Sequence, residues 1–369
     1  MSAQQKILVR GVNWLGDAVM STPALERLRQ ALPEAEIALL TPVRLAEVWK
    51  EYPHVDRVIE LGSDEGPWRI GRRLRSEKLE TALIFPNSPR SALEMWFAGI
   101  PNRVGYARPW RNWFLTRALP ARPGQVRMRK RPVVEAKRLV RETPAARRNG
   151  PPATAHHIYD YLHLVGALGA DETAVSPRLH IATSEVEEAG QRFGVLAGER
   201  WFGLNAGAQY GPAKRWPMDR FIAVAVEAQG RCDCRWIVFG GQHESGLAAE
   251  ITEGIRRAQP ATVQGGPLNV AGKSSLRDLC VLLKICRVLL TNDSGPMHVA
   301  AAVGTPVVVP FGSTSPELTA PGLPGERQGL LIGEAPCAPC FLRKCPVDFR
   351  CMTSIRVEQV VEALVKAAG

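Results

Sequence analysis

Short apolar runs alternate with amphipathic stretches of helical length along most of this chain, and this alternation constrains the fold more than any other feature. It first appears at residues 6–40, where an apolar run over 7–9 is followed by a glycine-containing turn, an amphipathic stretch and a second apolar run over 37–40. That order predicts a β-loop-α-β unit. Pro23 lies inside the helical stretch and predicts a bend or a restart of the helix there, with Thr22 available as a helix cap.

The alternation continues through the rest of the chain. It predicts strands over 83–85, 202–204, 236–239, 288–290 and 306–309, and helices over 91–98, 156–168, 184–193, 218–229, 244–257, 275–285 and 296–303. Strands that alternate with helices of this length form mostly parallel sheets with helices on both faces. The sequence therefore predicts an α/β fold in which the ligand-binding loops follow the carboxyl ends of the strands.

The length of 369 residues fits two domains, although a single large barrel would also fit. We place the boundary near 176–178, which gives an N-terminal domain over 1–178 and a second domain over 179–350. Residues 351–369 are predicted to form a C-terminal helix that packs back toward the N-terminal domain. Two such domains would place their ligand-binding edges on either side of a cleft.

Positive charge is concentrated in the first half of the chain. The 47 Lys and Arg residues exceed the 36 Asp and Glu residues by 11, and residues 1–180 hold 28 basic and 18 acidic side chains, an excess of 10. Residues 90–148 alone hold 15 basic and 3 acidic side chains, interleaved with aromatic residues. This stretch favours an anionic partner, either nucleic acid or a membrane glycolipid, with a merely solvated basic face as the alternative. Nothing in it matches a helix-turn-helix or an RNA-recognition motif.

The sequence contains no pattern typical of a secretory signal or a membrane-spanning helix. The N-terminal apolar run is short and ends at Arg10, and the longer apolar tracts at 279–290 and 299–311 are broken by charged residues or by proline. We therefore expect a cytoplasmic protein.

Four of the eight cysteines lie close together, at Cys337, Cys340, Cys345 and Cys351. Four thiols are enough to bind zinc, but these pairs are closer in sequence than the two knuckles of a zinc ribbon. A bound metal, disulfides and free thiols all remain open, and free thiols are favoured in a cytoplasmic protein.

Residues 291–298, Thr-Asn-Asp-Ser-Gly-Pro-Met-His, stand where an apolar strand ends and a proline-initiated helix begins. The backbone N–H groups of Ser294 and Gly295 have no partner within such a helix. Together with the positive end of the helix they favour binding of an anion such as a diphosphate. Helix capping by Asn292 and Asp293 is the alternative interpretation.

A second loop, at residues 205–217, also follows a strand and precedes a helix. Its small residues allow close backbone approach, and Lys214 and Arg215 add positive charge, although Lys214 could also be a solvated loop lysine. Neither loop has the glycine pattern of a dinucleotide site or of a Walker motif, so hydride transfer and ATP hydrolysis are disfavoured.

In the N-terminal domain, residues 11–17 span the first strand-to-helix turn, and Asp17 stands at the start of the helix. A carboxylate there can simply stabilise the helix dipole, by about 0.3–1 kcal/mol. Alternatively, Asp17 faces the cleft and acts as a general base.

Together these segments resemble glycosyltransferase family nine, the ADP-heptose:lipopolysaccharide heptosyltransferases, and within it the heptosyltransferase II group. The matching segments occur in the family's order, at 13–20, 105–106, 110–111, 205–208, 214–217 and 292–298. The resemblance covers nearly the whole chain and includes the cysteine-rich stretch. It implies the GT-B architecture, in which two Rossmann-like domains with mostly parallel sheets face each other across an interdomain cleft.

The resemblance also implies roles for individual residues. Asp17 matches the family's catalytic base, and Lys214 matches the lysine that neutralises the departing diphosphate. The implied donor and nucleotide-binding residues are Gly16, Asn205, Gly207, Glu244, Lys273, Ser275, Asp293, Ser294, Gly295 and His298. The implied acceptor-binding residues are Asn13, Asn87, Ser88 and Arg90.

The activity implied by the resemblance is inverting, metal-independent transfer of heptose from ADP-L-glycero-D-manno-heptose to the heptose/Kdo inner core of lipopolysaccharide, with no cofactor. The partners would be this donor and an anionic lipid A-Kdo-heptose acceptor at the inner face of the inner membrane, with no nucleic acid. A basic surface that includes Arg108 and Arg111 would meet the anionic acceptor. Two alternatives remain. One is heptosyltransferase I or another family-nine glycosyltransferase with a different acceptor, and the other is a nucleic-acid-binding protein on a degenerate transferase scaffold.

Overall fold

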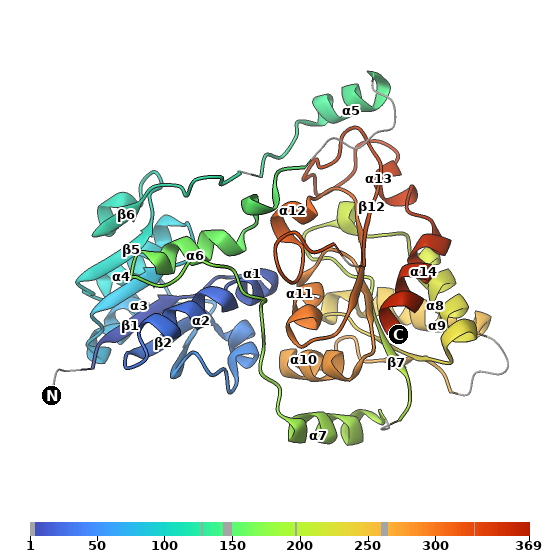
Figure 1. Cartoon of the computed structure of the whole chain (residues 1–369), viewed down its shortest axis with the longest axis horizontal. Helices are drawn as coiled ribbons and strands as arrows, with labels where there is room; N and C mark the ends of the chain where they lie inside the picture. Colours follow the sequence, from blue (N-terminus) through green and yellow to red (C-terminus); the bar gives the residue numbers. More distant parts are fainter. Residues whose placement is uncertain (1–3, 127, 143–149, 196–197, 260–264, 328) are drawn as a thin grey trace. The chain divides into compact units, whose positions relative to one another are not determined.

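A computed structural model describes residues 4–126, 128–142, 150–195, 198–259, 265–327 and 329–369. The chain forms two compact units (Figure 1). Unit 1 consists of Met1–Gln125 and Thr154–His180, and unit 2 consists of Val126–Ala153 and Ile181–Gly369.

Unit 1 is built on a six-stranded sheet with the order β3-β2-β1-β4-β5-β6, and every pair of neighbouring strands is parallel. The strands are β1 (Lys6–Arg10), β2 (Glu36–Pro42), β3 (Arg57–Leu61), β4 (Thr81–Ile84), β5 (Asn102–Tyr106) and β6 (Arg117–Leu119). The α-helices are α1 (Leu15–Met20), α2 (Thr22–Ala31), α3 (Pro67–Leu74), α4 (Pro89–Phe97) and α6 (Ile158–Gly166). The 3-10 turns are η1 (Val43–Trp49), η2 (Arg75–Glu77), η3 (Asn112–Phe114) and η4 (Ala153–Ala155), the last of which straddles a unit boundary.

Unit 2 is built on a second six-stranded parallel sheet, with the order β12-β11-β10-β7-β8-β9. Its strands are β7 (Trp201–Asn205), β8 (Arg235–Val238), β9 (Leu268–Asn269), β10 (Leu289–Thr291), β11 (Val307–Phe311) and β12 (Leu330–Ile332). The α-helices are α5 (Val133–Glu142), α7 (Thr183–Phe193), α8 (Met218–Cys232), α9 (Ser245–Ala258), α10 (Leu276–Ile285), α11 (Gly295–Ala302), α12 (Pro316–Thr319), α13 (Arg350–Thr353) and α14 (Val357–Ala368). The 3-10 turns are η5 (Pro212–Lys214) and η6 (Gln242–Glu244).

The two sheets share one topology. Counted from its own first strand, each sheet has the order 3-2-1-4-5-6, so the strand order reverses between β1 and β4 in unit 1 and between β7 and β10 in unit 2. The alternation of strands and helices therefore produced the predicted parallel α/β fold, in two Rossmann-like units. Ligands of such sheets bind beyond the carboxyl ends of the strands at the point of reversal.

The central strands are apolar because both faces of each sheet are covered. Ile7, Leu8 and Val9 of β1 are completely buried, and so are Leu289 and Leu290 of β10. Continuous apolar strands of this kind are typical of parallel sheets with helices on both sides. No α-helix in the described part of the chain is long and apolar enough to cross a membrane.

Two predictions about the domains are wrong. Residues 126–153, predicted to lie in the N-terminal domain, belong to unit 2, where Ala136 of α5 is part of the hydrophobic core. The C-terminal helix α14 packs against α8 of unit 2 (Figure 1). It also packs against β11 and contributes the buried Leu364 to the same core. Apolar periodicity indicates that a helix has a buried face but does not indicate which sheet it covers.

The restart predicted at Pro23 is confirmed, because α1 ends at Met20 and α2 begins at Thr22. The predicted cap is wrong. Ser21 occupies the N-cap position, and the Thr22 hydroxyl donates instead to the Val19 carbonyl at 2.8 Å.

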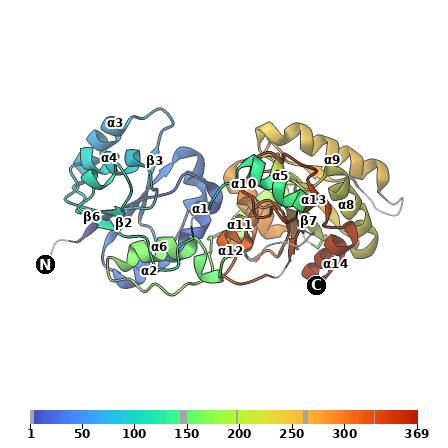
Figure 2. The same cartoon turned by 90° about the horizontal axis from the view of Figure 1, so that it is seen from above.

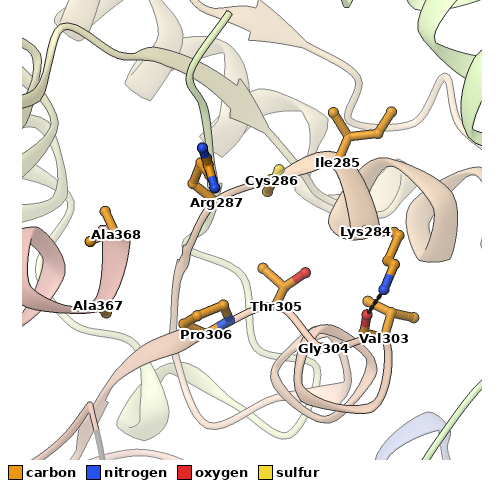
Figure 3. A pocket seen from close by; sticks show the side chains of 11 residues that line it. Lys284, Ile285, Cys286, Arg287, Val303, Gly304, Thr305, Pro306, Ala367 and Ala368 are labelled. Atoms are coloured by element: carbon orange, nitrogen blue, oxygen red, sulfur yellow. Dashed lines mark hydrogen bonds between the residues drawn. The ribbon is translucent and has the colours of Figure 1, made fainter. Parts of the chain in front are cut away.

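A cavity of about 440 Å³ lies at the amino ends of β10 and β11 (Figure 3). Arg287 and Pro306, which precede these strands, line it together with residues at the C-terminus of the chain. Lys284 lies at its edge and donates to the Val303 carbonyl at 2.7 Å. The cavity is at the edge of the sheet opposite to the one where parallel sheets bind ligands, so it is not the candidate active site.

Candidate active site

In unit 2, the loops that follow β7 and β10 are joined by side-chain hydrogen bonds. The Asn205 amide donates to Thr291 Oγ1 at 3.2 Å and to Ser294 Oγ at 3.3 Å. In the other direction, the Asn292 amide donates to the Ala206 carbonyl at 2.7 Å. The two loops that the sequence singled out therefore form one structure at the point where the strand order reverses.

Lys214 and Asp293 form an ion pair at this edge. The Nζ atom of Lys214 lies 2.7 Å from Asp293 Oδ2, and Thr314 Oγ1 donates to the same oxygen at 2.6 Å. The Lys214 ammonium also lies over the Tyr210 ring, 5.1 Å from its centroid. Asp293 is buried and the Lys214 side chain is 15% exposed, so the pair fixes one ammonium group near the start of α11.

The amino end of α11 supplies backbone donors beside this ammonium. Ser294 occupies the N-cap position, and its side chain makes no capping bond to the helix. A proline follows at the start of the helix, as predicted, and His298 is buried one turn further on. Amide groups at a helix start together with a fixed cation favour the binding of phosphate oxygens.

The other predicted donor residues have different surroundings. The Glu244 carboxylate lies against Gly207, where any side chain would collide with it, and it accepts a hydrogen bond from the Gly241 amide at 3.1 Å. Ser275 caps α10 by accepting from the Asp278 amide at 3.2 Å. Lys273 is exposed in the preceding turn. The Glu244 carboxylate thus lies against the loop that follows β7, which contains Gly207. Ser275, in contrast, has a structural role as the cap of α10.

In unit 1, Asp17 lies in the first turn of α1, next to Gly16. The Tyr161 hydroxyl, from α6, donates to Asp17 Oδ1 at 3.1 Å. Tyr161 is buried and its ring packs against Phe85, with 5.3 Å between the centroids. Burial and the nearby Asp17 charge raise the pKa of Tyr161 well above its ordinary value, so the hydroxyl keeps its proton and stays a donor.

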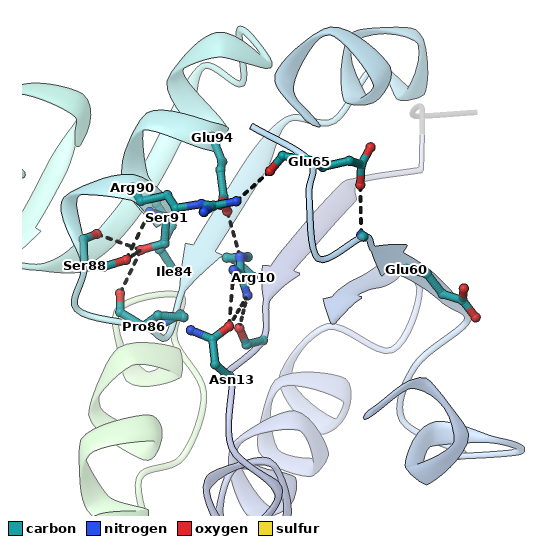
Figure 4. A network of polar contacts seen from close by, with 12 residues as sticks. Arg10, Asn13, Glu60, Glu65, Ile84, Pro86, Ser88, Arg90, Ser91 and Glu94 are labelled. Carbon is teal, nitrogen blue, oxygen red and sulfur yellow. Dashed lines mark hydrogen bonds and ion pairs between the residues drawn. The ribbon is translucent and has the colours of Figure 1, made fainter. Parts of the chain in front are cut away.

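A buried ion pair supports the loop that precedes Asp17 (Figure 4). Arg10 Nε lies 2.8 Å from Glu94 Oε2, and the two side chains are 4% and 0% exposed. The other end of the Arg10 guanidinium donates to the Gly11 carbonyl at 2.5 Å and to Asn13 Oδ1 at 3.4 Å. Glu94 also accepts from Arg90 at 3.2 Å, so one carboxylate connects the loop after β1 to the start of α4.

The predicted acceptor loop follows β4. Asn87 is exposed, and its side-chain oxygen accepts from Arg111 at 3.2 Å. Ser88 caps α4 by accepting from the Ser91 amide at 3.3 Å, which is a structural role. Asn13, Asn87, Ser88 and Arg90 therefore follow the two strands at the reversal point of unit 1, as the carboxyl-end rule predicts.

Arg111 is not a surface residue, contrary to the prediction. It is 0% exposed, and its guanidinium donates to Asn87 and to the Ile84 carbonyl, the latter at 3.2 Å. Burial lowers the pKa of Arg111 to about 10, and the nearby Arg108 charge acts in the same direction. Arg111 therefore positions Asn87 and cannot meet a partner directly.

Tyr161, Arg10 and Glu94 were not predicted as site residues. Tyr161 lies 144 residues from Asp17 in the sequence and Glu94 lies 84 residues from Arg10, so no local motif joins either pair. The sequence did contain one signal that singles out Glu94, because it is the only acidic residue between positions 87 and 134.

The four cysteines of the cluster form no disulfide. No disulfide joins any of the eight cysteines, and of the four near the C-terminus only Cys345 is not buried. Burial raises the pKa of Cys337 and of Cys340, which keeps both thiols protonated. Within the described ranges, no three His, Cys, Asp or Glu side chains are grouped as metal ligands.

The sequence was compared with models of known families. Residues 67–349 match the model described as glycosyltransferase family 9 (heptosyltransferase). The chain belongs to this family. It is therefore a glycosyltransferase, and its two Rossmann-like units are those of the family's GT-B architecture.

Several curated proteins resemble this family member over most of its length. It is 30% identical to lipopolysaccharide heptosyltransferase 2 of Escherichia coli K12, over 86% of this chain and 85% of that protein. Against lipooligosaccharide heptosyltransferase 2 of Haemophilus influenzae the identity is 29%, over 85% of each chain.

Solved structures agree with these relationships. The structure of E. coli ADP-heptose lipopolysaccharide heptosyltransferase II matches with a TM-score of 0.76 and 25% identity, over 99% of this chain and 98% of that one. A family 9 glycosyltransferase from Veillonella parvula also matches with a TM-score of 0.76, at 22% identity over 100% and 98% of the two chains, which supports the fold.

Proposed function

We propose that this glycosyltransferase transfers heptose from ADP-L-glycero-D-manno-heptose to the heptose/Kdo inner core of lipopolysaccharide, with inversion at the anomeric carbon. The similarity to the lipopolysaccharide heptosyltransferases 2 supports the choice of donor and acceptor. The observation that carries the proposal is the Lys214–Asp293 pair beside the amino end of α11, at the reversal point of unit 2. The Lys214 ammonium of this pair provides the positive charge that a departing nucleoside diphosphate requires.

Asp17 is assigned the role of general base. In an inverting transfer, the acceptor oxygen attacks the anomeric carbon while the bond to the diphosphate breaks on the opposite face. The acceptor proton passes to the Asp17 carboxylate as the new bond forms. Tyr161 donates to Asp17 Oδ1 and so orients the carboxylate for this role.

Lys214 is assigned the role of stabilising the leaving group. The electron pair of the broken bond stays on the β-phosphate oxygen of ADP, so negative charge grows there in the transition state. The Lys214 ammonium and the amides of Ser294 and Gly295 lie where they could bind that charge, with Asn205 holding the loop. A fixed cation and helix amides can do the work that Mg²⁺ does in other transferases, and we propose that the transfer is independent of metal.

Further residues complete the proposed site. Glu244, beside Gly207, and the exposed Lys273 are assigned to the nucleoside. Asn13, Asn87 and Arg90 are assigned to the acceptor, with Arg10 and Arg111 holding the first two of them. Because the acceptor is a membrane glycolipid, the protein is proposed to work from the cytoplasm at the inner face of the inner membrane.

An acceptor series tests the function. Purified protein is given ADP-heptose and Kdo-containing acceptors that carry no heptose or one heptose, and release of ADP and mass of the product are measured. The proposal predicts extension of the acceptor that already carries one heptose. Extension of only the heptose-free acceptor would assign the chain to the heptosyltransferase I activity. Absence of transfer to both acceptors would refute the proposed function.

A further inference from the structure

Unit 1 exposes tryptophan side chains that a soluble domain would normally bury. Trp96, Trp110 and Trp113 are 47%, 73% and 76% exposed, whereas the tryptophans of unit 2, Trp201 and Trp236 among them, are nearly inaccessible. Exposed aromatic residues that gather on one face indicate a binding surface.

These three tryptophans lie on α4 and around η3, two elements that contact each other. Trp110 and Trp113 make an edge contact with 5.9 Å between their ring centroids, and Trp96 contacts Phe97 at 5.1 Å and Phe114 at 6.0 Å. The two groups of rings meet at η3, which contains both Trp113 and Phe114. We call these five residues the tryptophan face. α3 packs beside α4 at the same place (Figure 2). There Gly71 leaves room for Phe97.

A defined turn holds Trp110 outward. Its backbone has a φ of 62°, in the left-handed region that a residue with a side chain rarely adopts. The neighbouring Arg111 anchors the turn from below, and the Arg108 amide closes it by donating to Asn112 Oδ1 at 2.9 Å. The exposure of Trp110 is thus built into the turn. Because Arg111 also binds Asn87, the tryptophan face borders the proposed acceptor loop.

The positive charge around this face is not neutralised. Arg75 donates to the Phe97 carbonyl at 3.0 Å, Arg103 to the Phe114 carbonyl at 2.7 Å, and Arg117 to the Ala167 carbonyl at 2.5 Å. None of the three forms an ion pair with a carboxylate in the part of the chain that the structure describes. The nearest acidic residue in sequence to η3 is Glu94, which is completely buried.

We propose that the tryptophan face docks on an anionic lipid bilayer. Tryptophan favours the interface between lipid and water, and cationic side chains near an anionic leaflet strengthen binding to it. Nucleic acid also attracts arginine and aromatic rings, but bases stack on parallel ring faces. Trp110 and Trp113 are perpendicular to each other, with an interplanar angle of 90°, and so form no such platform.

The inference deepens the proposed function, since an acceptor embedded in a bilayer requires the enzyme to work at that surface. Its test needs neither acceptor nor turnover. The full chain is sedimented with vesicles of phosphatidylcholine alone or of phosphatidylcholine mixed with phosphatidylglycerol, at low and at high salt. We expect salt-sensitive binding to the anionic vesicles only, with a partition coefficient that falls at least tenfold in Trp110→Ser/Trp113→Ser.

Two variants and one assay make the result specific. Trp110→Phe/Trp113→Phe should retain most of the vesicle binding. Trp68→Ser removes a tryptophan that is 55% exposed but is not part of the tryptophan face, and this variant should bind vesicles like the parent. Activity on a soluble acceptor without acyl chains should be unchanged in the serine double variant, so a docking defect is distinguished from a failure of the chemistry. Equal vesicle binding by the double variant and the parent would overturn the proposal. Binding of a DNA duplex in place of vesicles, lost in the same variant, would also overturn it.

Discussion

The buried Arg10–Glu94 pair offers a prediction whose size follows from its burial. In Glu94→Leu, the Arg10 guanidinium keeps its charge in a site that is 4% exposed and loses the carboxylate that lies 2.8 Å away. Removing one partner of a buried pair costs about 3–5 kcal/mol, because the other charge stays buried without compensation. For a unit of about 150 residues, each kcal/mol lowers the melting temperature by about 2–4 °C. We therefore expect the melting temperature of unit 1 to fall by on the order of 10 °C.

A matched control separates burial from the loss of a charge. Glu253 on α9 also pairs with two arginines, Arg256 and Arg257, but their side chains are 54% and 78% exposed. Exposed pairs contribute about 0–1 kcal/mol, so Glu253→Leu should leave unfolding nearly unchanged.

The double variant Arg10→Met/Glu94→Leu gives the decisive comparison. Apolar residues of similar volume often replace a buried ion pair without loss of stability, so the double variant should be more stable than Glu94→Leu. Transfer activity should stay low, because the Gly11 carbonyl and the Asn13 side chain have lost the donor that held their loop. Calorimetry and urea unfolding measure the first effect, and ADP release measures the second. Additive losses of stability in the double variant would refute the reasoning, as would a cost of Glu94→Leu no larger than that of Glu253→Leu.

Three further variants test the proposed chemistry. Asp17→Asn should fold like the parent and lose transfer by orders of magnitude, and undiminished turnover would remove Asp17 from the role of base. Tyr161→Phe removes a donor from the ionised carboxylate, a bond of about 1.5–3 kcal/mol, so activity should fall about tenfold or more. Because the carboxylate loses stabilisation, the acid limb of the pH profile should also move to higher pH, and an unmoved limb would contradict this coupling. Lys214→Ala should lower kcat by about 10²–10³-fold with little change in KM for the acceptor, and a change confined to the acceptor KM would count against leaving-group stabilisation.

The parallel topology and the positions of the four site loops could be predicted from the sequence. Each loop follows an apolar strand at a reversal point, and its small, polar and charged residues are adjacent in the chain. The residues that orient these loops could not be predicted in the same way. Tyr161 lies on α6, 144 residues after Asp17 in the sequence, and this pairing exists only after the chain has folded.

Charge counting also failed at particular positions. Arg111 contributes to the basic stretch that suggested a docking surface, but its side chain is directed inward onto the Ile84 carbonyl. A count of charges gives the net field of a segment and carries no information on the direction of each side chain. Arg75, Arg103 and Arg117, which remain without carboxylate partners among the described residues, carry the charge of the tryptophan face.

The assignment of residues 126–153 to unit 2 has a consequence for synthesis on the ribosome. α5 leaves the ribosome before any strand of unit 2 has been made, although its Ala136 packs into the core that later contains Trp216 and Leu364. Unit 1 in turn stays incomplete until α6 has been translated, because α6 packs on α2. A gene fragment that begins at residue 181 would therefore encode unit 2 without one of the helices that cover its core, and expression of this unit alone requires residues 126–153 joined to its start.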